Sequence, residues 1–231
     1  MKTQDQNHST RRRRARLTPL VAGAAGAIAI AGCVPFKTAP PTPAPTPTPS
    51  SSPPAVSAPT ITLLSSAGGP EAGGTSVTIT GTAFTGATSV AFGGTSVAPT
   101  INSSTSITAV APAGTGTVDV RVTTPAGTSP NTAADNYVYA PVPTVTDIDP
   151  NTGSAAGGES VSVFGDGYKV GGVDVVTSVT FGGTPATCTT VDDSELACTT
   201  PAHVSGLATV TVTTFGGPSP SNFPSDIFQY S

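Results

Sequence analysis

The chain has 231 residues, a formal net charge of −4 at pH 7, 26 Gly, 24 Pro and no Trp. Its basic residues are concentrated at the start. Three Lys and Arg residues and twelve Asp and Glu residues follow Cys33, so that part of the chain has a net charge of −9. A chain this acidic lacks the clustered basic residues that bind a phosphate backbone. Nucleic acid is therefore excluded as an expected partner.

The first 32 residues have the order of an export signal. The cluster Arg11 to Arg14 precedes a run of fifteen mostly apolar residues, 17–31. This run is shorter than the ~20 residues that a helix needs to span a bilayer. A basic start, a short apolar core and small residues at its end are typical of a secretory signal. We therefore predict a signal peptide at 1–32, with the general secretory and twin-arginine routes both open.

The apolar run ends in Ile30-Ala31-Gly32-Cys33. This tetrad resembles the bacterial lipobox, in which the cysteine is lipidated and becomes the first residue of the mature protein. Two acyl chains on Cys33 would hold the protein on a membrane, whereas a single chain binds only marginally. We expect a lipoprotein anchored to the cell envelope and facing the outside. A cleaved signal with an incidental Cys33 and an uncleaved signal anchor are the alternatives.

Residues 33–58 form a Pro-, Thr- and Ser-rich segment that we expect to be disordered. Six of the ten residues in Pro40–Pro49 are prolines, which remove backbone donors and fix one dihedral, so neither helix nor sheet forms there. Such a run favours extended polyproline II at ~3.1 Å per residue, which gives the segment a reach on the order of 60 Å. We interpret it as a stalk, either a bare spacer or one that carries O-glycans on its threonines.

One sequence unit occurs twice after residue 58. Gly81 corresponds to Gly165 at an offset of 84, and Phe92-Gly93-Gly94 corresponds to Phe181-Gly182-Gly183 at an offset of 89. The offset grows because the second copy gains five residues within Lys169 to Val176. Variable loops on a rigid framework often carry function, so this insertion is where we expect a specialised contact.

Each copy has the length of a small domain. Two copies predict tandem domains at 59–140 and 141–231, because a solenoid needs three or more stacked repeats. Val77 and Ile79 alternate with polar residues, and so do Val210 and Val212. This period of two predicts half-buried antiparallel strands with one solvent-exposed face. Short strands separated by Gly and Pro turns predict an all-β chain of two β-sandwiches.

Several motifs occur in the same order in both copies. In the first copy they are the run from Gly73 to Gly81, then Phe92-Gly93-Gly94, and last Tyr137-Val138-Tyr139. Together they resemble the IPT/TIG domain, an immunoglobulin-like fold also found in plexin-type receptors, Rel-type transcription factors and bacterial surface proteins. The resemblance implies two tandem immunoglobulin-like β-sandwiches. It implies no particular function, because one sandwich hosts many roles.

The second copy contains two cysteines, Cys188 and Cys198, which remain as a pair if Cys33 is acylated. Similar paired cysteines occur in plexin-type members of the family. An exported chain meets an oxidising compartment, so we predict a disulfide between them. A metal site is disfavoured because only His203 lies nearby, and a redox centre because the spacing is not Cys-x-x-Cys.

We predict no enzymatic activity, cofactor or metal. After Cys33 the chain contains one histidine, His203, and no nucleophile-elbow pattern frames its serines. Asp192, Asp193 and Glu195 form a carboxylate cluster, but their spacing differs from that of a dedicated calcium loop. We interpret His203 as a surface loop residue and the carboxylates as members of solvated turns.

Two functional readings remain for such a lipoprotein. In the first, the tandem domains mediate protein–protein contact or adhesion at the cell surface, or act as a structural spacer. In the second, they form a carbohydrate- or cell-wall-binding accessory module. Phe92 and Phe181 fit the core, and Tyr139 and Tyr230 end each copy. Few aromatic residues are then left to stack on sugars, which favours the first reading.

Metabolic labelling with an alkyne fatty acid tests the lipoprotein prediction. We expect label on the native chain and none on Cys33→Ala, because the acyl chains are attached through the thiol. Protease shaving of intact cells should remove the labelled protein. A native chain that stays unlabelled and is recovered from the medium would make Cys33 incidental and the protein a secreted module.

Overall fold

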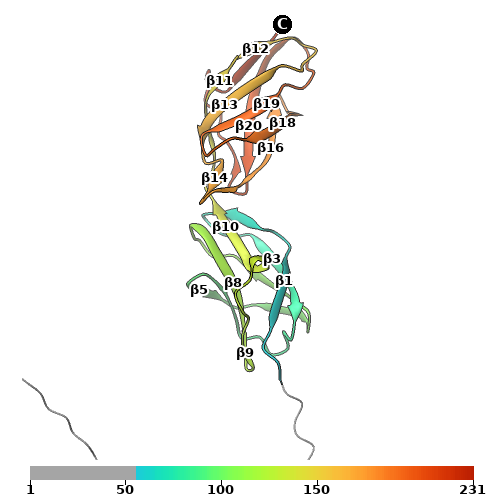
Figure 1. Ribbon diagram of the computed structural model, residues 1–231, viewed down its shortest axis with the longest axis vertical. Helices are drawn as coiled ribbons and strands as arrows, with labels where there is room; N and C mark the ends of the chain where they lie inside the picture. Colours follow the sequence, from blue (N-terminus) through green and yellow to red (C-terminus); the bar gives the residue numbers. More distant parts are fainter. Residues whose placement is uncertain (1–55) are drawn as a thin grey trace, which may run out of the picture. The chain divides into compact units, whose positions relative to one another are not determined.

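The computed structural model describes residues 56–231. This part contains twenty-two strands and one turn of 3₁₀ helix, η1 (Ala133–Asp135) (Figure 1). Within 56–231 no helix combines the length and apolar character needed to cross a membrane. The predicted signal at 1–32, Cys33 and nearly all of the predicted stalk lie outside the described residues.

The first domain is a sandwich of two sheets. Its strands are β1 (Thr60–Leu64), β2 (Gly68–Pro70), β3 (Ser76–Thr82), β4 (Ser89–Phe92), β5 (Thr95–Val97), β6 (Thr100–Ser103), β7 (Ser106–Val110), β8 (Gly116–Thr124), β9 (Gly127–Thr128) and β10 (Asn136–Ala140). One sheet has the order β1-β3-β7-β6, and the other has the order β2-β10-β8-β4-β5, with β9 paired to β8.

The second domain repeats this topology. Its strands are β11 (Thr144–Asp149), β12 (Thr152–Gly153), β13 (Ser160–Asp166), β14 (Lys169–Val170), β15 (Val173–Asp174), β16 (Val176–Phe181), β17 (Thr184–Pro185), β18 (Thr187–Thr190), β19 (Glu195–Thr199), β20 (Gly206–Thr214), β21 (Gly217–Pro218) and β22 (Ile227–Tyr230). The sheets have the orders β11-β13-β19-β18 and β12-β22-β20-β16-β17. The extra hairpin β14–β15 comes from the insertion. The predicted all-β fold with two tandem sandwiches is therefore confirmed.

Each domain has its own hydrophobic core between its two sheets. Strands β3 and β20 alternate buried and more exposed residues, as the period of two predicts. Phe92 and Phe181 are buried, and each lies edge-on against a second aromatic ring, Tyr137 at 5.3 Å and Phe228 at 5.5 Å between centroids. All members of both cores lie within Ile61–Tyr230. Both cores are therefore built from residues of the two repeated units.

The first two strands of each domain belong to opposite sheets of its sandwich. Strand β1 pairs antiparallel with β3, whereas β2 pairs parallel with β10 in the opposite sheet. In the second domain β11 and β12 do the same with β13 and β22. The sequence does not predict this parallel pairing, because Gly68-Gly69-Pro70 has no alternation of apolar and polar residues.

A repeated glycine lets two backbone segments approach closely. A Cβ atom on Gly81 would overlap the backbone carbonyl oxygen of Thr60 on the neighbouring strand. Gly165 meets the carbonyl oxygen of Thr144 in the same way, and the Tyr168 hydroxyl donates a hydrogen bond to that oxygen at 3.0 Å. The glycine recurs in both copies because no other side chain fits between these strands.

The insertion of the second domain contacts the first domain. The apolar residues of this contact, which we name the joint cluster, are Val138, Ala140, Val170, Val175 and Phe215. Within the second domain, the Thr214 hydroxyl donates a hydrogen bond at 3.0 Å to the carbonyl oxygen of Pro141, the residue that follows the first domain. The inserted loop therefore does make a specialised contact, and its partner lies within the same chain.

Replacing Gly81 by alanine tests the close approach. We expect Gly81→Ala to lower the free energy of unfolding of residues 56–231 by about 1–3 kcal/mol, because the added methyl group forces the two strands apart. Gly94→Ala is the matched control, since a Cβ atom there meets nothing within 4 Å. Chemical denaturation measures both. Equal stabilities of the two variants would contradict the packing described here.

Candidate functional site

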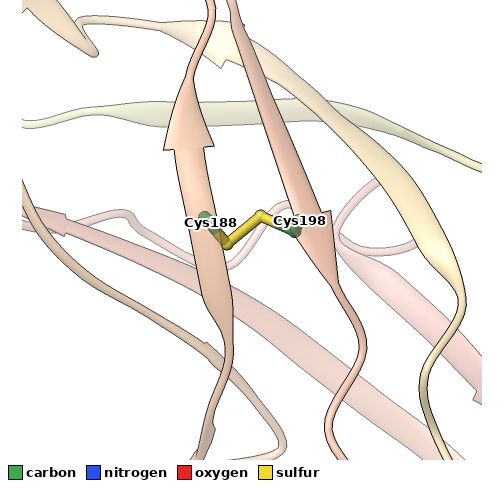
Figure 2. The surroundings of a disulfide bond; sticks show 2 residues. All are labelled: Cys188 and Cys198. Carbon is green, nitrogen blue, oxygen red and sulfur yellow. A yellow bond between two sulfur atoms is a disulfide. The ribbon is translucent and has the colours of Figure 1, made fainter.

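The predicted pair of cysteines forms a disulfide bond across two neighbouring strands (Figure 2). Cys188 on β18 lies directly opposite Cys198 on β19, with 4.0 Å between their Cα atoms. Cys198 is buried, and the half-buried Cys188 packs against the core of the second domain. The bond holds the outer strand β18 in place and closes a short loop, which contributes roughly 3 kcal/mol in the chain-entropy model. Its role is structural.

The carboxylates of Asp192, Asp193 and Glu195 accept hydrogen bonds from other residues of the second domain. Asp192 accepts hydrogen bonds from the backbone N–H and the hydroxyl of Ser194, at 2.8 and 2.9 Å, and these bonds hold its pKa below the ordinary value. Asp193 accepts the backbone N–H of Lys169 at 2.8 Å. Glu195 accepts the hydroxyl of Ser162 at 2.8 Å. Within 56–231 no group of three or more His, Cys, Asp or Glu residues is arranged to hold a metal ion.

His203 packs more closely than a free surface loop residue would. Its ring stacks on Tyr230, with 5.0 Å between centroids and 19° between planes. Its Nδ1 lies 2.9 Å from the carbonyl oxygen of Val204, which can only accept, so Nδ1 donates. The opposite ring atom, Nε2, faces the backbone of Gly182. The imidazole is thus wedged between a turn and an aromatic ring, as expected for a packing role.

Glu159 ties two loops of the second domain together. Its carboxylate accepts the backbone N–H of Ser154 at 2.7 Å and the hydroxyl of Thr200 at 2.8 Å. The Thr200 hydroxyl oxygen in turn accepts the backbone N–H of Glu159 at 3.1 Å. Hydrogen bonds from Ser154 and then Thr200 favour the ionised carboxylate and lower its pKa.

The most distinctive surface feature is an apolar hollow on the second domain, which we name the Phe223 groove. It has a volume of about 240 Å³. Its lining residues are Asn151, Thr152, Leu207, Phe223, Pro224, Ile227 and Gln229. Phe223 is 72 % exposed and Leu207 is 62 % exposed. Two large exposed apolar side chains beside one hollow make it a candidate contact surface.

The loop that carries Phe223 is held by a buried carboxylate. Asp226, only 1 % exposed, accepts the hydroxyl of Ser221 at 3.0 Å and the backbone N–H of Asn222 at 2.8 Å. The Asn222 side chain also donates to the carbonyl oxygen of Val145 at 2.9 Å. Phe223 is therefore displayed by a loop with specific tertiary contacts, and its exposure is a property of the fold.

Sequence reasoning missed the Phe223 groove. Leu207 and Gln229 face each other across β20 and β22, while Phe223 comes from the loop before β22. A partial signal was available, because Leu207 occupies an outward position of the period-two pattern where the first copy has Thr117. This signal is not specific, since Val110 of the first domain is also an exposed apolar residue on a strand.

Glu159→Gln tests the carboxylate network through its pH dependence. The folded pKa lies below the unfolded value, so the charged form stabilises the fold above the ordinary pKa of 4.5 and this contribution is lost as the pH falls through the folded pKa. We expect the variant to unfold more easily than the native chain at neutral pH and about equally at acidic pH. The exposed Glu71→Gln is the control. A stability difference that is independent of pH would contradict the network.

Comparisons with known proteins agree with this architecture. The family model described as IPT/TIG domain matches residues 59–139 and 143–231. Mouse (Mus musculus) Fibrocystin-L is 36% identical over 70 residues, which cover 30% of this chain and 2% of that protein.

The chain also matches solved structures. The extracellular region of plexin A4 is 25% identical with a TM-score of 0.44, and the match covers 75% of this chain and 18% of that one. SGBP-B from a complex xyloglucan utilization locus in Bacteroides uniformis is 22% identical with a TM-score of 0.31, over 70% of this chain and 48% of that one. The chain thus spans a small part of Fibrocystin-L and of plexin A4, and about half of SGBP-B. Because the family model matches most of the chain in two successive segments, the protein belongs to the IPT/TIG domain family and contains two tandem copies of that domain.

Proposed function

We propose that the protein is an exported, lipid-anchored protein of the cell envelope that makes protein contacts through the Phe223 groove. The observation that carries this proposal is the exposure of Phe223 and Leu207 around one uncharged hollow. Large aromatic side chains that fill a partner's pocket dominate the energy of many interfaces. The groove offers both parts of such a contact, an aromatic anchor and a place to receive one.

The order of segments supports export and anchoring. A signal peptide at 1–32 delivers the chain, acylated Cys33 holds it on the membrane, and the stalk at 33–58 carries the domains 59–140 and 141–231 away from the surface. The bond between Cys188 and Cys198 supports an oxidising location outside the cytosol. The stalk and the first domain act as a spacer that presents the second domain to the outside.

The size and lining of the groove support contact with a side chain. Its volume of about 240 Å³ is smaller than the ~300–1,000 Å³ typical of small-molecule sites. A single apolar side chain from another protein fits such a hollow. The side chain of His203 stacks on Tyr230, and the carboxylates described above accept hydrogen bonds within the domain. These structural roles support a protein without catalytic activity.

Carbohydrate binding is the second candidate. Sequence analysis found few aromatic residues left for sugars, but Phe223 is mostly exposed and shares its groove with the side-chain amides of Asn151 and Gln229. An aromatic face beside hydrogen-bonding amides has the mixed character of many ligand sites. The small volume of the groove places this candidate second.

Binding of residues 56–231 to envelopes of the producing cells tests the proposal. We expect Phe223→Asp to bind at least about tenfold more weakly, since loss of an aromatic anchor costs about 2 kcal/mol or more. Val110→Asp, at an exposed apolar position of the first domain, is the matched control and should bind normally.

A glycan array with the same three proteins separates the two candidates. Binding to glycans that is lost in Phe223→Asp would replace the protein-contact proposal by the carbohydrate one. Envelope binding of Phe223→Asp at native strength would contradict both, because neither could then depend on the groove.

A further inference from the structure

Part of the Phe223 groove on the second domain corresponds in position to the surface of the first domain that the second domain covers. Thr152 and Gln229 of the groove are paired in register on β12 and β22. Their counterparts in the first copy are Gly68 and Val138, which are paired in the same way on β2 and β10. The groove and the covered surface thus overlap at these two positions, whereas Thr117 and Asn136, the counterparts of Leu207 and Ile227, are exposed in the first domain.

In the first domain this place receives an aromatic ring. Phe215 packs within the joint cluster beside Val138, and a Cβ atom on Gly68 would come within 2.5 Å of the Phe215 ring. Val138 is consequently 5 % exposed. The outer face of the sheet at its β2–β10 edge is therefore a surface on which a phenylalanine of another domain can pack.

In the second domain the positions equivalent to Gly68 and Val138 are Thr152 and Gln229, both of which are exposed. Leu207 replaces Thr117 and is 62 % exposed, and Ile227 replaces Asn136. These two substitutions add apolar surface beside Gln229. Burying it gains free energy in proportion to the area removed from water. Covering Leu207 and Ile227 therefore gains free energy, while the polar Gln229 at the centre of the face replaces the apolar Val138 of the first copy.

The chain itself displays a side chain that fits this place. Among the aromatic residues of 56–231, Phe223 alone is mostly exposed, and it lies at the rim of the groove. An exposed ring beside a hollow that accepts a ring is self-complementary. In a contact with two-fold symmetry, the same patch serves on both molecules.

Charge does not oppose contact between copies at this face. The described residues include two basic side chains, Arg121 and Lys169, against twelve acidic ones, so two copies repel each other. No charged residue lines the groove. Two grooves can therefore meet without opposing carboxylates.

We propose that a second copy of this chain occupies the Phe223 groove, so that each Phe223 inserts into the groove of its partner. This inference rests on the proposed contact role and names the partner of that site. The association is driven by apolar burial against a general acidic repulsion. Added salt screens the repulsion, so it should strengthen the dimer.

Sedimentation velocity of residues 56–231 over a concentration series tests the dimer. We expect the native protein to shift from monomer to a species of twice the mass as concentration or salt rises. Phe223→Asp and Leu207→Asp should remain monomeric throughout, while Phe223→Leu should retain part of the association. Val110→Asp is the matched control and should dimerise like the native protein. Near-ultraviolet circular dichroism establishes that each variant is folded.

Two outcomes would overturn the inference. One is a native protein that remains monomeric at every concentration, and the other is a dimer that persists in folded Phe223→Asp. A monomeric native protein whose envelope binding depends on Phe223 would reject the self-association and leave the proposed contact function intact. A Phe223-dependent dimer without envelope binding would support the self-association and reject contact with a different partner.

Discussion

The packing of Phe215 against the edge of the first domain is the contact on which the functional interpretation depends. It buries Val138 and Ala140 together with Val175 from the inserted loop. The same contact shows what this place of the fold accepts, which is an aromatic ring presented by another domain. The positions of the second domain that correspond to Gly68 and Val138 are exposed, and the exposed Leu207 lies beside them in the Phe223 groove.

The duplicated fold is constrained more by backbone approach than by the identity of core side chains. Phe84 in the first copy corresponds to Tyr168 in the second, and both are buried. Gly81 and Gly165, in contrast, cannot change without overlap with a carbonyl oxygen. This difference explains why the glycines reappear at a constant offset while the aromatic residues around them vary. Surface positions such as Thr117 and Leu207 meet no such constraint, and there the two copies differ in polarity.

The period-two pattern was sufficient to predict the sandwiches, because each strand buries one face and exposes the other. The glycine and aromatic motifs predicted the duplication and the family, and the resemblance led to the pairing of Cys188 with Cys198. The parallel strands β2 and β12 could not be predicted, since a segment such as Gly68–Pro70 is too short to show a period. The Phe223 groove was missed because its residues come together only through the register of β20 with β22.

Hydroxyl-radical labelling of Phe223 is the most direct measurement of whether the groove is occupied where the protein works. The full chain would be labelled on intact cells and, for comparison, as purified protein at high dilution. We expect the peptide that contains Phe223 to be oxidised readily in the dilute protein and to be protected on cells, while a peptide that contains the exposed Val110 reacts equally in both. Equal oxidation of Phe223 in the two settings would mean that its groove stays open to solvent, and would contradict a contact function for this surface.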